Sequence, residues 1–245
     1  MSTRNPARER FVTEAFRAGA RDALGVPAAV VAAGMVGFGA FALEHGMSLP
    51  LALACTAGIW ALPGQMVLLE THASGAPGYL TVLAVLITNA RFLPITLSLM
   101  PLIREPRYGR LTLYALAQLN SMTGWTWAMR ACVDMPQRER IPYFAGFAGA
   151  CWSVCIVATG ASYLVAGGFP PELRVGLVFL APLYYLVILI GDARTSLAII
   201  ALACGALAGP LCYLVSAQWS VLLAGVVGGT AAYGIDRLYR RRSHA

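Results

Sequence analysis

The sequence predicts an all-α protein, a polytopic membrane helical bundle of seven or eight transmembrane segments, some of them broken mid-membrane. Of its 245 residues, 58% are hydrophobic and only 12% are charged, whereas about a quarter of the residues in soluble domains are charged. The charged residues also leave long gaps, with none in 23–43, 111–129, 141–171 or 195–235. Because a helix needs about 20 apolar residues to cross a bilayer, gaps of this size predict membrane spans.

Apolar runs, and the turn-forming residues between them, divide the chain into eight predicted segments. They cover residues 26–43, 49–69, 79–103, 111–133, 143–166, 175–190, 196–215 and 221–235. Together they predict a single transmembrane domain over residues 23–236, followed by a basic cytoplasmic tail over residues 237–245.

Residues 1–22 form a predicted cytoplasmic, amphipathic segment that precedes the first span. Its apolar and basic side chains alternate as in a helix that lies in the membrane interface; they are Phe11, Val12, Ala15 and Phe16 on one side and Arg10, Arg17 and Arg21 on the other. The alternative is a leader that frays. A cleaved signal peptide is not expected, because about 22 polar or amphipathic residues come before the first full-length span.

The distribution of arginine predicts the orientation, because cytoplasmic loops retain basic residues. If both termini are cytoplasmic and all eight segments cross, 13 arginines lie inside and four outside. We therefore expect a multi-pass protein of the bacterial inner membrane with both termini in the cytoplasm. The loop from Arg104 to Arg110 contradicts this scheme, since it puts three arginines outside; a segment that enters and returns, or is broken mid-membrane, would explain it.

Several function classes are disfavoured by the same sequence. The net charge of +7 comes from residues between spans and at the ends, so it indicates membrane topology and not a nucleic-acid surface. The spans contain no paired carboxylates, HExxH, GxSxG or nucleotide-binding motif. The six cysteines lack metal-ligand spacing. We therefore expect neither an enzyme nor a protein with a metal or cofactor.

Two segments differ from plain membrane anchors. The second contains Pro63, Gly64 and Gln65, and both Pro and Gly weaken a helix, so a break near Gln65 is predicted. The third carries Asn89 and, about midway along it, Arg91. A mid-membrane Arg costs roughly 2.5 to 3.5 kcal/mol on insertion scales, so it is expected to face a partner or a wet cavity. Broken helices that line such a cavity form the substrate sites of many secondary transporters.

With these features the chain resembles the AzlC family, the large subunit of bacterial branched-chain amino acid exporters. The resemblance runs over most of the sequence. It rests on the order and spacing of weak motifs: Phe16–Asp22, Pro63–Met66, Thr88–Phe92, Gly149–Ser153, Phe179–Leu183 and Gly205–Gly209. It implies a secondary transporter that exports branched-chain or other small apolar amino acids and is driven by the proton-motive force, with a small AzlD-type membrane subunit as partner.

One departure from the family leaves the substrate open. The acidic Thr-Asp-Glu stretch that the family usually carries in its fourth segment is replaced here by Gln118–Gly124, which contains Asn120 and no acid. The alternatives are therefore a permease for another small zwitterion or an organic acid, and an assembly subunit that does not itself transport.

The predicted substrate site or translocation pathway consists of seven residues: Arg91, Asn89, Gln65, Gly64, Pro63, Asn120 and Pro182. Several of these residues could have a structural role instead of a role in the substrate site. Arg91 could pair with Glu70 or Asp192, Gln65 and Asn89 could recap a broken helix, and Asn120 could form an ordinary interhelical hydrogen bond.

Overall fold

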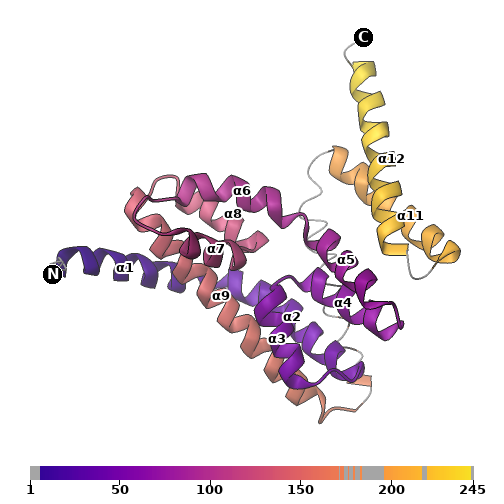
Figure 1. Cartoon of the computed structure of the whole chain (residues 1–245), viewed down its shortest axis with the longest axis horizontal. Helices are drawn as coiled ribbons and strands as arrows, with labels where there is room; N and C mark the ends of the chain where they lie inside the picture. The colour runs from indigo at the N-terminus through magenta and orange to yellow at the C-terminus, as the bar shows by residue number, and fades with distance from the viewer. Residues whose placement is uncertain are drawn as a thin grey trace. The chain divides into compact units, whose positions relative to one another are not determined.

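The computed structural model describes residues 6–170, 172, 173, 176, 179, 183, 196–216 and 220–243, and this part of the chain contains eleven helices and no strand (Figure 1). The helices are α1 (Pro6–Ala23), α2 (Val26–Glu44), α3 (Leu49–Ile59), α4 (Leu62–Ala73), α5 (Gly78–Asn89), α6 (Phe92–Ile103), α7 (Arg110–Gln118), α8 (Met122–Ala131), α9 (Gln137–Ala166), α11 (Ser196–Val215) and α12 (Ser220–Ser243). The all-α prediction is confirmed for the described residues.

The chain divides into two compact units. The larger comprises residues 1–66 and 88–181, and the smaller comprises residues 67–87 and 182–245. Each is described by itself below. The single transmembrane domain over residues 23–236, with its flanking segment and tail, stays a prediction.

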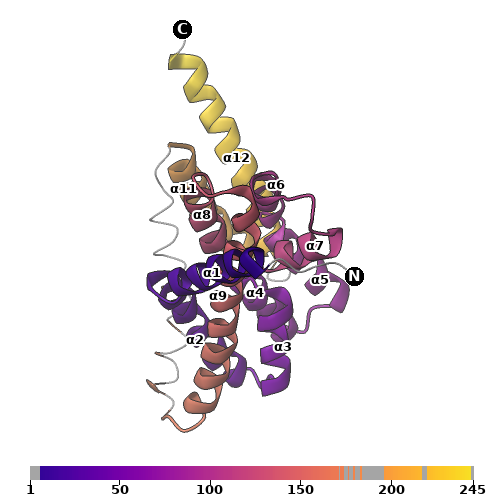
Figure 2. The same cartoon turned by 90° about the vertical axis from the view of Figure 1, so that its left-hand side faces the viewer.

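Helix α9 is the centre of the larger unit, and α1 and α2 pack along it. Figure 2 shows α9 between α2 and α3. Glycines permit the closest approach: a Cβ on Gly19 would overlap the Tyr143 carbonyl oxygen, and one on Gly146 would overlap that of Phe16. Small residues at such crossings are typical of packed membrane helices.

The described part of the N-terminal segment, α1, is therefore a packed helix and not a fraying leader. Helix α1 buries its small residues Ala15, Gly19 and Ala23, whereas Phe16 remains 47% exposed. The sequence pattern emphasised the aromatic side of this helix, but the backbone contact with α9 requires the small side.

Helices α2 and α9 run side by side in the same direction, because the later part of one lies against the later part of the other. The Ser162 hydroxyl donates to the Val36 carbonyl at 2.5 Å, and the Tyr163 hydroxyl donates to the Met47 carbonyl at 2.7 Å. The far end of α9 and the end of α2 therefore lie at the same level.

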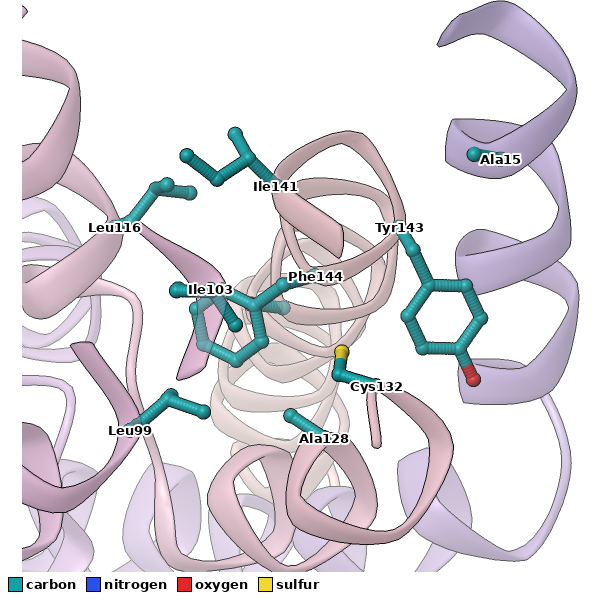
Figure 3. Packing of buried hydrophobic residues seen from close by; sticks show 10 residues of the cluster. Ala15, Leu99, Ile103, Leu116, Ala128, Cys132, Ile141, Tyr143 and Phe144 are labelled. Carbon is teal, nitrogen blue, oxygen red and sulfur yellow. The ribbon is translucent and has the colours of Figure 1, made fainter. Parts of the chain in front are cut away.

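A hydrophobic cluster joins α9 to α6, α7 and α8. Phe144 is fully buried among Leu99, Ile103 and Leu116, and Figure 3 shows Tyr143 pointing the other way, toward α1. The Tyr143 hydroxyl donates to Asp22 Oδ2 at 2.7 Å and accepts from Trp127 Nε1 at 3.0 Å. One turn of α9 thus fixes both the N-terminal helix and the α6–α8 region.

The smaller unit contains α11 and α12, which lie side by side (Figures 1 and 2). Their contact again uses glycine, since a Cβ on Gly228 would lie 3.3 Å from Gly205 Cα.

Among the described helices, α2 and α9 are each long and apolar enough to cross a membrane, and α5 with α6 becomes a third candidate if their 46° bend is one broken span. Four predicted segments coincide with single helices: 26–43 with α2, 143–166 with α9, 196–215 with α11 and 221–235 with α12. Segment 175–190 lies largely outside the described residues. The remaining three, 49–69, 79–103 and 111–133, are each divided into two helices.

Candidate functional site

Three helix breaks lie in the larger unit. The first separates α3 from α4 at Trp60 and Ala61, the second separates α5 from α6 at Ala90 and Arg91, and the third separates α7 from α8 at residues 119–121. Each break exposes backbone groups that an uninterrupted helix would have paired.

Proline explains the positions of the first two breaks. A proline ring clashes with the carbonyl group four residues earlier, which is Ile59 for Pro63 and Ala90 for Pro94. Helix α3 ends at Ile59, and α5 ends just before Ala90. The prediction of a break near Gln65 was wrong by a few residues, because Pro63 occupies the first turn of α4, where a missing N–H breaks no helical bond.

The third break was not predicted, and it has a different cause. Ser121 has extended backbone, and its hydroxyl oxygen accepts the Gly124 N–H at 3.0 Å, which makes it the N-cap of α8. Serine is among the residues that most favour this position. The polar run around Asn120 therefore stops one helix and starts another.

The first and second breaks contact each other through Gly64 and Asn89. A Cβ on Gly64 would lie 2.5 Å from Asn89 Nδ2 and 2.7 Å from Asn89 Oδ1. The amide at the end of α5 therefore rests against the first turn of α4, at the one position of that turn without a side chain.

The third break contacts the first break, and it also contacts α6, the helix that begins at the second break. Trp60 Nε1 donates to the Leu119 carbonyl at 3.1 Å, and Gln118 Nε2 donates to the Gly58 carbonyl at 2.5 Å. Asn120 Nδ2 lies 3.1 Å from Thr96 Oγ1 of α6. Three interruptions that are far apart in the sequence thus meet in one region, which we call the break cluster.

Buried amides in the break cluster have unused hydrogen-bonding capacity. Gln65 is fully buried, and neither its Oε1 nor its Nε2 has a partner; Asn89 Oδ1 and Asn120 Oδ1 are also buried without one. In the described part of the chain, these account for four of the five such side-chain atoms. Leaving a buried polar group unpaired costs about 1–3 kcal/mol, so their concentration here makes the break cluster the candidate for a polar ligand site.

The helix ends at the breaks supply complementary partial charges. Helices α4, α6 and α8 begin there, and α3, α5 and α7 end there. Free N–H groups make a helix N-terminus partly positive, and free carbonyls make a C-terminus partly negative. Together with the amides, these ends offer donors and acceptors but no ionisable side chain within the cluster itself.

Arg91 lies beside the cluster without joining it. It occupies the N-cap position of α6, is exposed, and holds its guanidinium carbon 5.3 Å from the centroid of the Phe92 ring. In the described part of the larger unit Arg91 forms no ion pair. Glu70 belongs to the smaller unit and Asp192 lies outside the described residues, so a pair with either stays a prediction. Because Arg91 follows Asn89 by two residues in the sequence, its guanidinium group places a full positive charge at the second break.

The remaining predicted site residues divide into two kinds. Pro63 shapes the first break, as argued above, whereas Pro182 lies outside the described residues. Sequence reasoning missed Trp60, which has the left-handed backbone angle φ 51°, and Ser121. Ser121 is followed three residues later by Gly124 and not by the Glu or Gln of a capping box, so no local signal marked it. No local signal marks a left-handed Trp either.

A groove of about 640 Å³ opens beside the third break. Its floor and walls come from α1, α3, α7 and α9, and its lining residues include Ala57, Gln118, Leu119, Gly149, Ala150 and Trp152. Trp152 Nε1 donates to the Ala57 carbonyl at 3.1 Å. The lining is mostly apolar, with the Gln118 amide at the end nearest the break cluster.

The described structure has the features of a polytopic helical membrane protein. They are apolar helices of membrane-spanning length, further short apolar helices, and interrupted segments around buried amides. The sequence model of one family, described as AzlC protein, matches residues 27–169. The chain therefore belongs to the AzlC family, a family of branched-chain amino acid transport proteins. No curated protein and no solved structure matches the chain.

The matched region runs from α2 through α9 and so contains the whole break cluster. The family assignment predicted from the motifs is confirmed. Pro182 and the smaller unit's α11 and α12 lie beyond the match.

Proposed function

We propose that the protein is a secondary transporter that exports branched-chain or other small apolar amino acids across the bacterial inner membrane, driven by the proton-motive force. Family membership supports amino acid transport. The break cluster supports the assignment of the substrate site. In it, three helix interruptions meet around buried amide groups that lack hydrogen-bond partners.

The break cluster suits an amino acid zwitterion. A carboxylate is matched by the free N–H groups at the start of α4 and by the Gln65 amide nitrogen. An ammonium group is matched by the carbonyl ends of α3, α5 and α7 and by the amide oxygens of Asn89 and Asn120. Since the zwitterion has no net charge, a site of neutral groups can desolvate it without leaving an unpaired charge.

Arg91 serves in this proposal as the charge that attracts the carboxylate toward the second break. Its guanidinium matches a carboxylate with two parallel hydrogen bonds. Its exposure is consistent with a wet approach to the site, because an Arg at mid-membrane depth in contact with lipid would be costly. Pro63 and Gly64 hold the first break open, and Pro182, which lies outside the described residues, stays a proposed pathway residue.

A permease for another small zwitterion is a second candidate, and the neutral fourth segment favours it. Asn120 occupies a stretch in which the family usually has acids, and it is 3% exposed with a free Oδ1. A substrate without a primary amine, such as a quaternary ammonium zwitterion, needs no hydrogen-bond acceptor at its nitrogen. The small AzlD-type subunit remains the proposed partner in both cases, and both termini are proposed to be cytoplasmic.

Counterflow in proteoliposomes tests the proposal. The chain is reconstituted with and without its small partner, and each preparation is loaded with the unlabelled form of the solute that is supplied radiolabelled outside, which is leucine, valine, glycine or glycine betaine. We expect leucine and valine to accumulate transiently. Accumulation of glycine betaine alone would favour the second candidate, and no exchange of any of the four by the folded complex would contradict transport of such zwitterions.

A further inference from the structure

The start and the end of the α7–α8 pair lie at the same level of the larger unit. The loop before α7 covers residues 104–109, and it contacts the start of α9, which follows α8. Gln137 Nε2 donates to the Arg104 carbonyl at 2.8 Å, and Arg107 Nη2 donates to the Arg138 carbonyl at 2.5 Å.

Arg140 strengthens this connection. Its Nη1 donates to the Leu102 carbonyl near the end of α6, and its Nε donates to the Met135 carbonyl in the loop after α8, both at 2.9 Å. One side chain of α9 thus ties together the segment that leads into α7 and the segment that leaves α8. The chain enters and leaves the α7–α8 pair at one place.

The lengths of the two helices agree with a turn at mid-membrane. Helix α7 has 9 residues and α8 has 10. At about 1.5 Å per residue each is roughly 14 or 15 Å long, which is half of a hydrocarbon core of about 30 Å. The third break is the tip of this pair, and it contacts Gly58 and Trp60 at the interior end of α3.

We propose that α7 and α8 form a re-entrant hairpin that does not cross the membrane, and that the tip of this hairpin is a gate over the substrate site. The hairpin topology stands on the contacts around Arg104, Leu102 and Arg140 alone. The gating role rests in addition on the proposed transport function.

This topology removes the conflict in the arginine distribution once one of the broken segments 49–69 and 79–103 is also taken not to cross, because a cytoplasmic N-terminus and a cytoplasmic Arg104 require an even number of crossings between them. The loop from Arg104 to Arg110 lies on the same side as the loop from Arg130 to Arg140, instead of on the opposite side. The basic residues of both loops then share one face, which the positive-inside tendency assigns to the cytoplasm. Segment 111–133, expected to cross, instead enters from the cytoplasm and returns to it.

Two hydrogen bonds hold the proposed gate in place, and a groove lies beside it. The bonds from Gln118 to the Gly58 carbonyl and from Trp60 to the Leu119 carbonyl hold the tip against α3. Gln118 and Leu119 also line the groove of about 640 Å³. Movement of the tip away from Gly58 would therefore join the break cluster to this groove on the cytoplasmic side, from which an exporter takes its substrate.

Cysteine labelling tests the topology without any transport assay. Pro106→Cys and Asp134→Cys place exposed thiols in the loops before and after the hairpin, and His45→Cys marks the end of α2, at the far end of α9. The six native cysteines are buried or partly buried, so the unaltered chain serves as the blank. The reagent is a membrane-impermeant maleimide applied to spheroplasts, and the assembled complex is used.

We expect His45→Cys to react in sealed spheroplasts, and Pro106→Cys and Asp134→Cys to react only after the membrane is permeabilised. Reaction of Pro106→Cys and Asp134→Cys from opposite sides would overturn the hairpin. Reaction of both in sealed spheroplasts would keep the hairpin but overturn a cytoplasmic gate.

Cross-linking tests the gate. In the Gly58→Cys/Gln118→Cys double variant, a short bifunctional thiol reagent joins the tip to α3, and each single variant treated with the same reagent is the control. We expect cross-linking to abolish the leucine efflux that the double variant shows before treatment, and the same reagent to leave the efflux of each single variant at its own untreated rate. Efflux that survives complete cross-linking would overturn the gate while leaving the proposed transport function intact.

If the untreated double variant transports nothing, a second readout takes the place of efflux. Ser121→Cys is added, and its labelling rate from the cytoplasmic side is measured before and after the tip is joined to α3 with a reagent that is applied first and then removed. A gate predicts that joining the tip slows this labelling. An unchanged rate would overturn the gate.

Discussion

The amide group of Asn89 occupies the space in which a side chain at position 64 would lie. A Cβ built on Gly64 would be 2.5 Å from Asn89 Nδ2, closer than carbon and nitrogen atoms pack. The last residue of α5 is thereby held against the first turn of α4. This contact joins two helix breaks, and it makes Gly64 the residue on which their relative position depends.

Gly64→Ala is therefore expected to displace Asn89. Overpacking of this kind costs about 1–3 kcal/mol, and we expect a lower melting temperature of the detergent-solubilised complex together with reduced leucine efflux. The matched control is Gly78→Ala at the start of α5, where an added Cβ has no neighbour within 4 Å. Equal melting temperatures and efflux rates for the two variants would contradict the close contact.

The crossing of α1 and α9 offers a second matched pair on one helix. Gly146→Ala puts a methyl group into the Phe16 carbonyl oxygen, whereas Gly149→Ala meets nothing within 4 Å. We expect the first to destabilise the complex by at least about 1 kcal/mol and the second to leave its stability nearly unchanged. Thermal unfolding followed by tryptophan fluorescence measures both; the reverse order would show that α1 does not pack here.

The clash of proline with the carbonyl four residues earlier accounts for two of the three breaks, at Pro63 and Pro94. It does not predict breaks by itself, because Pro101 and Pro210 lie inside continuous helices. The family and the polar residues of the cluster were accessible from sequence. The third break was not, because Asn120 and Ser121 are equally common in continuous membrane helices. The meeting of the breaks could not be predicted either, since Trp60 and Leu119 are far apart in the chain and their bond depends on packing against α9.

Asn120→Asp tests whether the neutral fourth segment governs proton dependence. A carboxylate at this position can take up a proton during transport, whereas the amide cannot. We expect leucine efflux by the variant to vary with pH more steeply than efflux by the unaltered protein. Asn120→Ser, which is neutral, is the control. Identical pH profiles for all three proteins would exclude position 120 from proton coupling.

Arg91 is expected to matter for transport more than for stability. Arg91 is exposed, and among the described residues its guanidinium has a cation–π contact with the neighbouring Phe92 ring. Arg91→Ala is therefore predicted to abolish efflux while folded protein remains in the membrane. Arg91→Lys is predicted to keep part of the activity with a higher apparent KM, since the charge remains but the two-pronged geometry does not.

Membrane abundance and initial efflux rates measured together separate this role from a structural one. If Arg91 were mainly an ion-pair member, Arg91→Ala would lower abundance first, and neutralising its acidic partner as well would restore both quantities. Normal efflux by Arg91→Ala at normal abundance would remove Arg91 from the site.

A substitution of Gln65 is expected to affect the stability of the complex and its substrate binding in opposite directions. The Gln65 side chain is fully buried with both polar atoms unpaired, so Gln65→Leu replaces an unsatisfied amide with an apolar group of similar size. Removing an unpaired polar group of this kind is worth about 1–3 kcal/mol. The variant is therefore predicted to melt at the same temperature as the unaltered complex, or higher, although it loses transport.

The most direct test of whether the break cluster binds the substrate is equilibrium binding of radiolabelled leucine to the purified complex. Binding is compared between the complex of the unaltered chain and the complex of the Gln65→Leu variant. Isoamylamine and isocaproate, which lack the carboxylate and the amine of leucine respectively, serve as competitors. We predict that the unaltered complex binds leucine, that neither competitor displaces it, and that Gln65→Leu no longer binds it while remaining folded. Leucine binding of unchanged affinity in Gln65→Leu would contradict the assignment of the substrate site to the break cluster.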